Sequence, residues 1–115
     1  MVILGIDPGY AITGYGIIEF KNSKYSYKSF GAITTSSKDK FTKRLEIIFK
    51  SVNELIEEYN PEAMSIEKLY FQNNHKTAID VAQARGVILL AAELHKLPIY
   101  EYTPLQIKNA LTGYG

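Results

Sequence analysis

The chain opens with Val2-Ile3-Leu4-Gly5-Ile6-Asp7-Pro8-Gly9, an apolar run that ends in an acidic turn. A nearly continuous apolar run over residues 2–6 is typical of a strand at the centre of a sheet, covered on both faces. The run ends on Asp7, and an ionised carboxylate in that setting costs free energy to desolvate unless something pairs with it. Asp-Pro-Gly is also strong turn chemistry, so a purely structural explanation of Asp7 stands beside the functional one.

A second apolar stretch, Ala63-Met64-Ser65-Ile66-Glu67, also ends on a carboxylate. If the two strands are parallel neighbours, Asp7 and Glu67 converge on one point. Two negative charges about 4 Å apart repel by roughly 4 kcal/mol at an effective dielectric near 20, so such a site calls for a cation. Oxygen ligands without Cys or a nearby His favour Mg²⁺ or Mn²⁺. Glu67 could instead be a solvated charge where a strand leaves the core.

Length and composition limit the classes of protein to which the chain can belong. Its 115 residues, 46% of them hydrophobic, suffice for one domain with a single core. The formal net charge is only +1, so any nucleic-acid role rests on local clusters of Lys and Arg. The absence of Cys excludes a disulfide framework and thiol chemistry. No basic region precedes the apolar start and no segment reaches membrane-spanning length, so we expect a soluble, cytoplasmic protein.

The first third of the chain has the composition of strands. Two stretches rich in Tyr, Ile, Phe and Thr follow the opening run, at residues 13–20 and 25–34. The polar tetrapeptide Lys21-Asn22-Ser23-Lys24 between them has the length of a hairpin loop. Three successive antiparallel strands are the simplest interpretation.

The pattern then changes to a helical period. Apolar residues recur at the spacing of one helix face: Phe41, Leu45, Ile48, Val52, Leu55, Ile56 and Tyr59. Asp39 is placed to begin this helix, and Asn60-Pro61 ends it. Residues 62–67 form the fourth predicted strand.

The remaining elements alternate between helix and strand. A second helix is predicted from about Lys76 to Lys96, and it is apolar nearly all round from Val87 to Leu94. A helix of this kind is usually buried, in part against another subunit. Residues 98–102 form a short fifth strand, and Thr103-Pro104 opens a third helix with an N-cap residue and a proline at the first position.

This βββαβαβα order predicts an α/β fold with a mixed five-stranded sheet. Strands that are joined by helices pair in parallel through right-handed crossovers, so the fourth strand lies beside the first and the strand order is 3-2-1-4-5. Asp7 and Glu67 then lie together at carboxyl ends of strands, where open α/β sheets keep their sites.

A series of motifs carries a more specific resemblance. In order along the chain they are Gly5-Ile6-Asp7-Pro8-Gly9, Thr13-Gly14-Tyr15-Gly16, Ile66-Glu67-Lys68-Leu69-Tyr70-Phe71, Gln83-Ala84-Arg85-Gly86-Val87, Glu101-Tyr102-Thr103-Pro104 and Thr112-Gly113-Tyr114-Gly115. Together they resemble the RuvC family of bacterial Holliday-junction resolvases over essentially the whole chain. The resemblance implies a single nuclease domain over residues 1–115 with a ribonuclease H-like fold.

The resemblance also implies an activity and its cofactor. The first two metal-binding carboxylates of the family carry over to Asp7 and Glu67. Such enzymes hold two Mg²⁺ ions about 4 Å apart and hydrolyse phosphodiesters of four-way junctions in DNA recombination and repair. They act as homodimers, and the family further implies a branch-migration motor complex as a partner. The family continues beyond Gly115 to the last acidic ligands, so we expect this chain alone to be inactive or weakly active.

Four further residues are candidates for DNA binding by the same resemblance. Tyr70 is at the position of an aromatic wedge that stacks on opened bases, and Phe71 is the second candidate; packing on the core is the alternative for either. Lys108 matches a lysine near the scissile phosphate. Arg85 either contacts a phosphate or belongs to a local polar network.

Two other classes of protein are compatible with parts of this sequence. Actin-like ATPases and sugar kinases also place a Gly-Ile-Asp-x-Gly turn against phosphates, but those folds need two such domains. A non-catalytic junction-binding module is the alternative if the chain naturally ends here.

Overall fold

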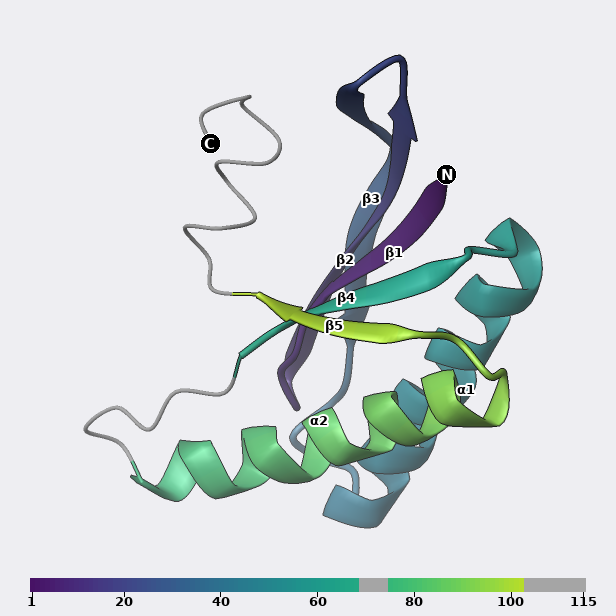
Figure 1. The fold of residues 1–115 in the computed structure, drawn as a ribbon. Helices are drawn as coiled ribbons and strands as arrows, with labels where there is room; N and C mark the ends of the chain where they lie inside the picture. Colours follow the sequence, from purple (N-terminus) through teal and green to yellow (C-terminus); the bar gives the residue numbers. More distant parts are fainter. Residues whose placement is uncertain (69–74, 103–115) are drawn as a thin grey trace.

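The fold is one five-stranded mixed sheet with two helices, and the computed structural model describes residues 1–68 and 75–102 (Figure 1). The elements are β1 (Val2–Asp7), β2 (Ile12–Lys21), β3 (Lys24–Thr34), α1 (Phe41–Tyr59), β4 (Ala63–Glu67), α2 (His75–Leu94) and β5 (Ile99–Tyr102). The strand order is β3-β2-β1-β4-β5, which confirms the predicted sheet. The predicted third helix lies outside the described residues.

The opening apolar run lies at the centre of the sheet. β1 pairs antiparallel with β2 and parallel with β4. On one face, Leu4 and Ile6 of β1 and Met64 and Ile66 of β4 are almost fully buried. Because side chains alternate along a strand, the residues between them, Gly5 among them, point to the other face.

Both helices pack on the same face of the sheet (Figure 1). α1 contributes Ile48 and Val52 to the core, and α2 contributes Ile88 together with small alanines that allow a close approach. His95 Nε2 and Asn53 Oδ1 form a hydrogen bond of 2.9 Å that joins the two helices. The opposite face of the sheet carries a cavity, which is described with the site below.

The ends of α1 match the sequence prediction at one terminus only. The helix begins at Phe41 after Lys40 and has no side-chain cap, so the prediction that Asp39 begins it was wrong. The Asp39 N–H instead donates to the Ser36 carbonyl at 3.1 Å, within a turn. At the other end, Asn60 adopts a left-handed conformation and its N–H donates to the Ile56 carbonyl at 2.9 Å, as expected of a helix stop.

The β2–β3 hairpin is tighter than predicted. Lys21 and Lys24 pair with each other as the last rung of the ladder, so the predicted four-residue loop is a two-residue turn. Asn22 and Ser23 both have positive φ, 54° and 64°, which matches the twist of the flanking strands. The ladder shifts register between Ile17 and Ile18.

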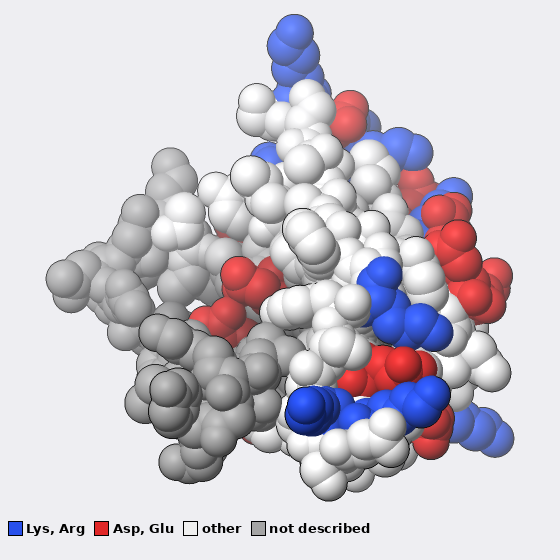
Figure 2. All heavy atoms as spheres, turned by 90° about the horizontal axis from the view of Figure 1, so that it is seen from above, with Lys and Arg blue, Asp and Glu red and all other residues white. Residues whose placement is uncertain are grey.

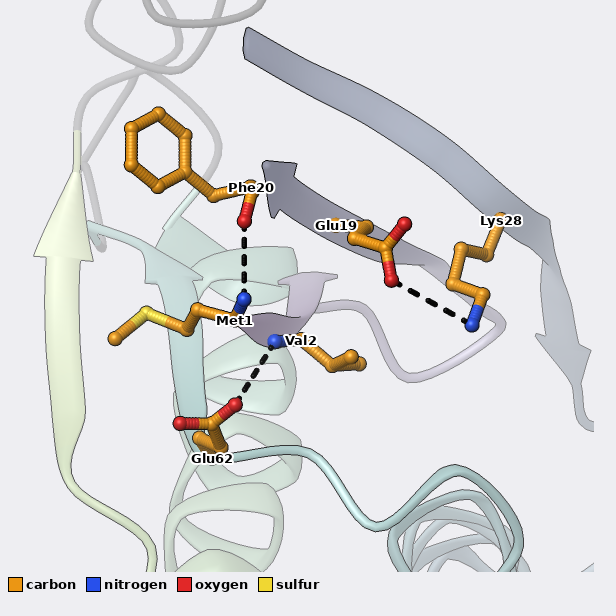
Figure 3. A network of polar contacts seen from close by, with 6 residues as sticks. All are labelled: Met1, Val2, Glu19, Phe20, Lys28 and Glu62. Atoms are coloured by element: carbon orange, nitrogen blue, oxygen red, sulfur yellow. Dashed lines mark hydrogen bonds and ion pairs between the residues drawn. The ribbon is translucent and has the colours of Figure 1, made fainter. Parts of the chain in front are cut away.

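A polar network holds the amino end of the sheet (Figure 3). The Met1 ammonium donates to the Phe20 carbonyl at 2.9 Å, and the Val2 N–H donates to Glu62 Oε1 at 3.4 Å. An ion pair of 3.7 Å joins Lys28 and Glu19. The first two contacts fix the start of β1, at the end of the strand opposite Asp7, and the ion pair joins β3 to β2.

No helix of the described residues is long and apolar enough to cross a membrane.

Candidate metal centre at the carboxyl ends of β1 and β4

The two predicted carboxylates lie close together at the carboxyl ends of two neighbouring strands. Ile6 and Ile66 are partners in the parallel β1–β4 pair, and Asp7 and Glu67 follow them. Both carboxylates line one cavity of about 420 Å³ on the face that α1 and α2 leave open. The carboxyl ends of β1, β4 and β5 point to the same side of the molecule (Figure 1). The predicted convergence is therefore confirmed.

The environment of Glu67 opposes its ionisation. Burial raises the pKa of the Glu67 carboxyl to about 7, and a hydrogen bond with Asp7 and the negative charge of Asp7 add to the effect. Without a cation, the pair therefore keeps a proton until the pH rises to about 7. A divalent cation would take the place of that proton and relieve the repulsion.

Glycines keep the cavity open beside the carboxylates. Gly14 lies opposite Asp7 in the β1–β2 ladder, and a Cβ there would approach the Asp7 Cβ at 3.6 Å. At Gly16 a Cβ would lie only 2.7 Å from the Tyr27 ring. Tyr27 and Phe30 form the outer wall, with ring centroids 6.0 Å apart in an edge-on arrangement.

The turn after Asp7 is held by Thr13, which is fully buried. Its hydroxyl donates to the Gly9 carbonyl at 2.6 Å, and the Gly9 N–H donates to Thr13 Oγ1 at 3.3 Å. A Cβ at Gly9 would lie 2.1 Å from the Ile12 carbonyl oxygen, so the turn has no room for any other residue. The geometry gives Gly9 a structural role that is independent of any phosphate.

A buried arginine from α1 braces the same turn. Arg44 is only 8% exposed, and its Nε donates to Thr35 Oγ1 at 2.9 Å. The Thr35 hydroxyl donates to the Tyr10 carbonyl, and the Arg44 guanidinium lies 4.9 Å above the centre of the Tyr10 ring. The sequence analysis missed Arg44, although its place on the apolar face of the helix, four residues before Ile48, is the signal that could have found it.

Arg85 lies behind Glu67 in a polar network. Its Nε lies 3.3 Å from the Glu67 carbonyl oxygen, and its Nη2 lies 2.6 Å from Glu101 Oε2 on β5. The Arg85 side chain is 13% exposed. Of the two alternatives left open by the sequence, this geometry favours the local network.

The described residues supply two acidic ligands and no more. Within residues 1–68 and 75–102, no three His, Cys, Asp or Glu side chains lie close enough to hold a metal ion together. Three of the predicted DNA-binding residues, Tyr70, Phe71 and Lys108, lie outside the described part of the chain.

The sheet order and the two converging carboxylates define a ribonuclease H-like fold with its acidic site at the usual edge. The family model described as crossover junction endodeoxyribonuclease RuvC matches residues 3–115. The chain therefore belongs to the RuvC family, whose members are hydrolases that cut DNA crossover junctions.

Individual relatives agree with this assignment. Over its whole length the chain is 51% identical to crossover junction endodeoxyribonuclease RuvC of Clostridioides difficile (strain 630), of which it covers 68%. It is 55% identical to the RuvC of Halothermothrix orenii and covers 70% of it. The fold matches that of T. thermophilus RuvC in complex with a Holliday junction substrate, with a TM-score of 0.87 and 31% identity over 97% of this chain and 72% of that one. The family assignment sets aside the ATP-binding domain considered from the sequence.

Proposed function

We propose that the chain is the nuclease domain of a magnesium-dependent endonuclease that resolves four-way DNA junctions in recombination and repair. The observation that carries the proposal is the convergence of Asp7 and Glu67 in one cavity, where burial and mutual repulsion oppose the ionisation of Glu67. Family membership supports the junction as substrate, since the Thermus relative was solved with a Holliday junction.

The donor set fits a hard divalent cation. Asp7 and Glu67 offer carboxylate oxygens, the ligands that Mg²⁺ and Mn²⁺ prefer, and their excess negative charge needs a counterion. When bound, two such ions supply the Lewis acidity for in-line attack of water on a phosphodiester. The chain's own part is to hold these oxygens at adjacent strand ends. The chain covers 68% of the Clostridioides difficile relative, and we propose that the part of the family outside this match supplies the remaining acidic ligands.

Local features, rather than overall charge, would bind the DNA. Basic and acidic side chains are interspersed on the face shown in Figure 2, in keeping with a net charge of +1. We propose Tyr70 as the aromatic wedge with Phe71 as the second candidate, because stacking on one opened base contributes roughly 1–3 kcal/mol. Lys108 is proposed to contact the scissile phosphate.

A homodimer is proposed to bind the junction, with α2 at its interface. Ile79, Leu90 and Leu94 on this helix are 60%, 51% and 62% exposed. Their spacings of 11 and 4 residues are close to whole turns of a helix with 3.6 residues per turn, so they share one face of α2. A twofold dimer brings two sites to opposing strands, as symmetric cleavage requires. A branch-migration motor complex is a further proposed partner.

The test uses a protein of the full length of the relatives. Asp7→Asn and Glu67→Gln should each lower cleavage of a synthetic four-way junction by about 10²–10³-fold, the range expected when one stabilising group of a catalytic centre is removed. Binding of the same junction in Ca²⁺ should be spared. Glu62→Gln is the matched control, because this carboxylate lies at the opposite end of β4. Full cleavage by both site variants would refute the proposed function.

A further inference from the structure

We propose that Arg85 is a positioning residue for Glu67, and that it acts through the backbone of β4 rather than on the DNA. The inference rests on the proposed function, since it assumes that Glu67 holds metal. Arg85 is the one predicted DNA-binding residue that lies within the described residues.

The Arg85 guanidinium ties helix α2 to two strand ends. Its Nε lies 3.3 Å from the carbonyl oxygen of Glu67, the last residue of β4. Its Nη2 lies 2.6 Å from Glu101 Oε2 on β5. The Lys68 N–H donates to the Tyr102 carbonyl at 2.9 Å and closes the same edge of the sheet. The Arg85 guanidinium therefore joins the carboxyl ends of β4 and β5 to α2, the helix that covers them.

The guanidinium lies on the face of the sheet opposite the metal cavity. Glu101 pairs with Ile66, and Ile66 is fully buried under the helices. Neighbouring residues on a strand point to opposite faces, so the Glu67 carboxylate points to the cavity while its carbonyl is held from behind. Arg85 can thus fix the direction of Glu67 without approaching the ion.

The surroundings of Arg85 do not suit a phosphate contact. The side chain is 13% exposed, and the Glu101 carboxylate at 2.6 Å already balances its charge. A phosphate would have to displace that carboxylate and reach the helix-covered face of the sheet. The hydrogen bond to Glu101 is between ionised groups and about twice as strong as a neutral one, so a phosphate that only replaced it would gain nothing.

Loss of the network should weaken metal binding. Groups that orient metal ligands typically change metal affinity or activity by 10–100-fold when they are mutated, roughly the range expected here. The Glu67 carbonyl would lose its donor, so the direction of the Glu67 carboxylate would no longer be fixed. This effect acts on the metal requirement and leaves the phosphate contacts intact.

The test compares Arg85→Met, Glu101→Gln and the double variant in a protein of the full length of the relatives. Each single variant should raise the Mg²⁺ concentration for half-maximal cleavage, and the Kd for Mn²⁺ measured by electron paramagnetic resonance without DNA, by about tenfold. The double variant should have the same Kd for Mn²⁺ as the single variant that binds Mn²⁺ more weakly, because both changes break one network. The Kd for the junction, measured without divalent ions, should stay within twofold of the parent value, and so should the slope of its salt dependence.

Two controls separate positioning from folding. Lys43→Met with Glu46→Gln removes an exposed ion pair of 2.8 Å on α1 and should change none of these values. Arg85→Lys keeps the charge and one donor and should recover part of the metal affinity. If Arg85→Met does not fold, Glu101→Gln and Arg85→Lys carry the test.

Two results would overturn the inference. If Arg85→Met weakened junction binding tenfold and lowered the salt slope by about one, with Mn²⁺ affinity unchanged, Arg85 would be a phosphate contact. Unchanged metal and junction affinities in every variant would leave it a purely structural residue. The Glu67→Gln protein, measured alongside, reports on the proposed function separately: if it bound Mn²⁺ as well as the parent, that function would fail whatever Arg85 does.

Discussion

Glu67 lies beside Asp7 across the β1–β4 pair, and burial together with a hydrogen bond to Asp7 raises the pKa of the Glu67 carboxyl to about 7. In the unfolded chain the same carboxyl titrates near 4.5. The folded protein thus binds this proton more tightly than the unfolded chain does. The difference links stability to pH with a defined sign.

We expect the metal-free protein to lose stability as pH rises through this window. The contribution of Glu67 is fully present below about pH 4.5 and is lost progressively until the pH passes about 7. Urea unfolding of the present chain in a chelating buffer, at steps from pH 4 to pH 8, measures the effect. Glu67→Gln should flatten the profile, so the difference between the two proteins isolates this group. A parent profile that rises relative to the variant would contradict the prediction.

Chain length should decide catalysis. The described residues bring two acidic side chains together, and a complete centre needs more ligands. We expect the present chain to cleave four-way junctions slowly or not at all in Mg²⁺, whereas a protein of the relatives' full length should cleave them. Gel assays with the two proteins at equal concentration make the comparison. Efficient metal-dependent nicking by the present chain would show that the two acidic side chains suffice.

Helix α2 should control dimerisation. Leu90 and Leu94 are more than half exposed, and burying one leucine stabilises an interface by about 1.5–3 kcal/mol. Leu90→Lys should therefore weaken the dimer by at least about tenfold in sedimentation of the longer protein. Ile12→Lys is the matched control, because Ile12 is also more than half exposed but lies on β2. Equal effects of the two variants would place the interface elsewhere.

The turn after Asp7 should tolerate glycine alone at position 9. A Cβ at Gly9 would lie 2.1 Å from the Ile12 carbonyl oxygen, so the backbone must move. We expect Gly9→Ala to lower the free energy of unfolding by about 2–3 kcal/mol, as other overpacking substitutions do. Gly14→Ala is the control: its Cβ would make an ordinary 3.6 Å contact with Asp7, and the cost should stay below about 1 kcal/mol. Equal thermal shifts in both variants would contradict this account.

The sequence was sufficient to predict the sheet and the pair of carboxylates because both follow from local patterns and one topological rule. An apolar run that ends on Asp7, a second that ends on Glu67, and a right-handed crossover between them leave one arrangement. The hairpin turn was harder to predict, since Asn22-Ser23 lacks the glycine that marks most such turns. The predicted start of α1 was wrong because Asp39 takes part in a turn and does not cap the helix.

The partners of the two arginines could not be predicted from the sequence. Arg85 contacts Glu101 and the Glu67 carbonyl only because α2 passes the carboxyl ends of β4 and β5. Arg44 reaches Thr35 across the end of the sheet in the same way. Such contacts join residues that no local pattern links, so the sequence reveals a polar residue on an apolar face but not its partner.

Arg44 provides the last prediction, on the support of the turn that carries Asp7. Its guanidinium donates to Thr35 at 2.9 Å and stacks over the Tyr10 ring, so one buried side chain holds both the end of β3 and the turn. Arg44→Met removes the charge-assisted hydrogen bond and the cation–π contact, and should lower the free energy of unfolding by about 2–4 kcal/mol. Arg44→Lys should fall between, because an ammonium lacks the planar fork. Lys43→Met is the matched control: Lys43 is exposed, so its ion pair with Glu46 should contribute little to stability. Urea denaturation of the three variants decides the matter, and an Arg44→Met protein as stable as Lys43→Met would show that the turn stands without Arg44.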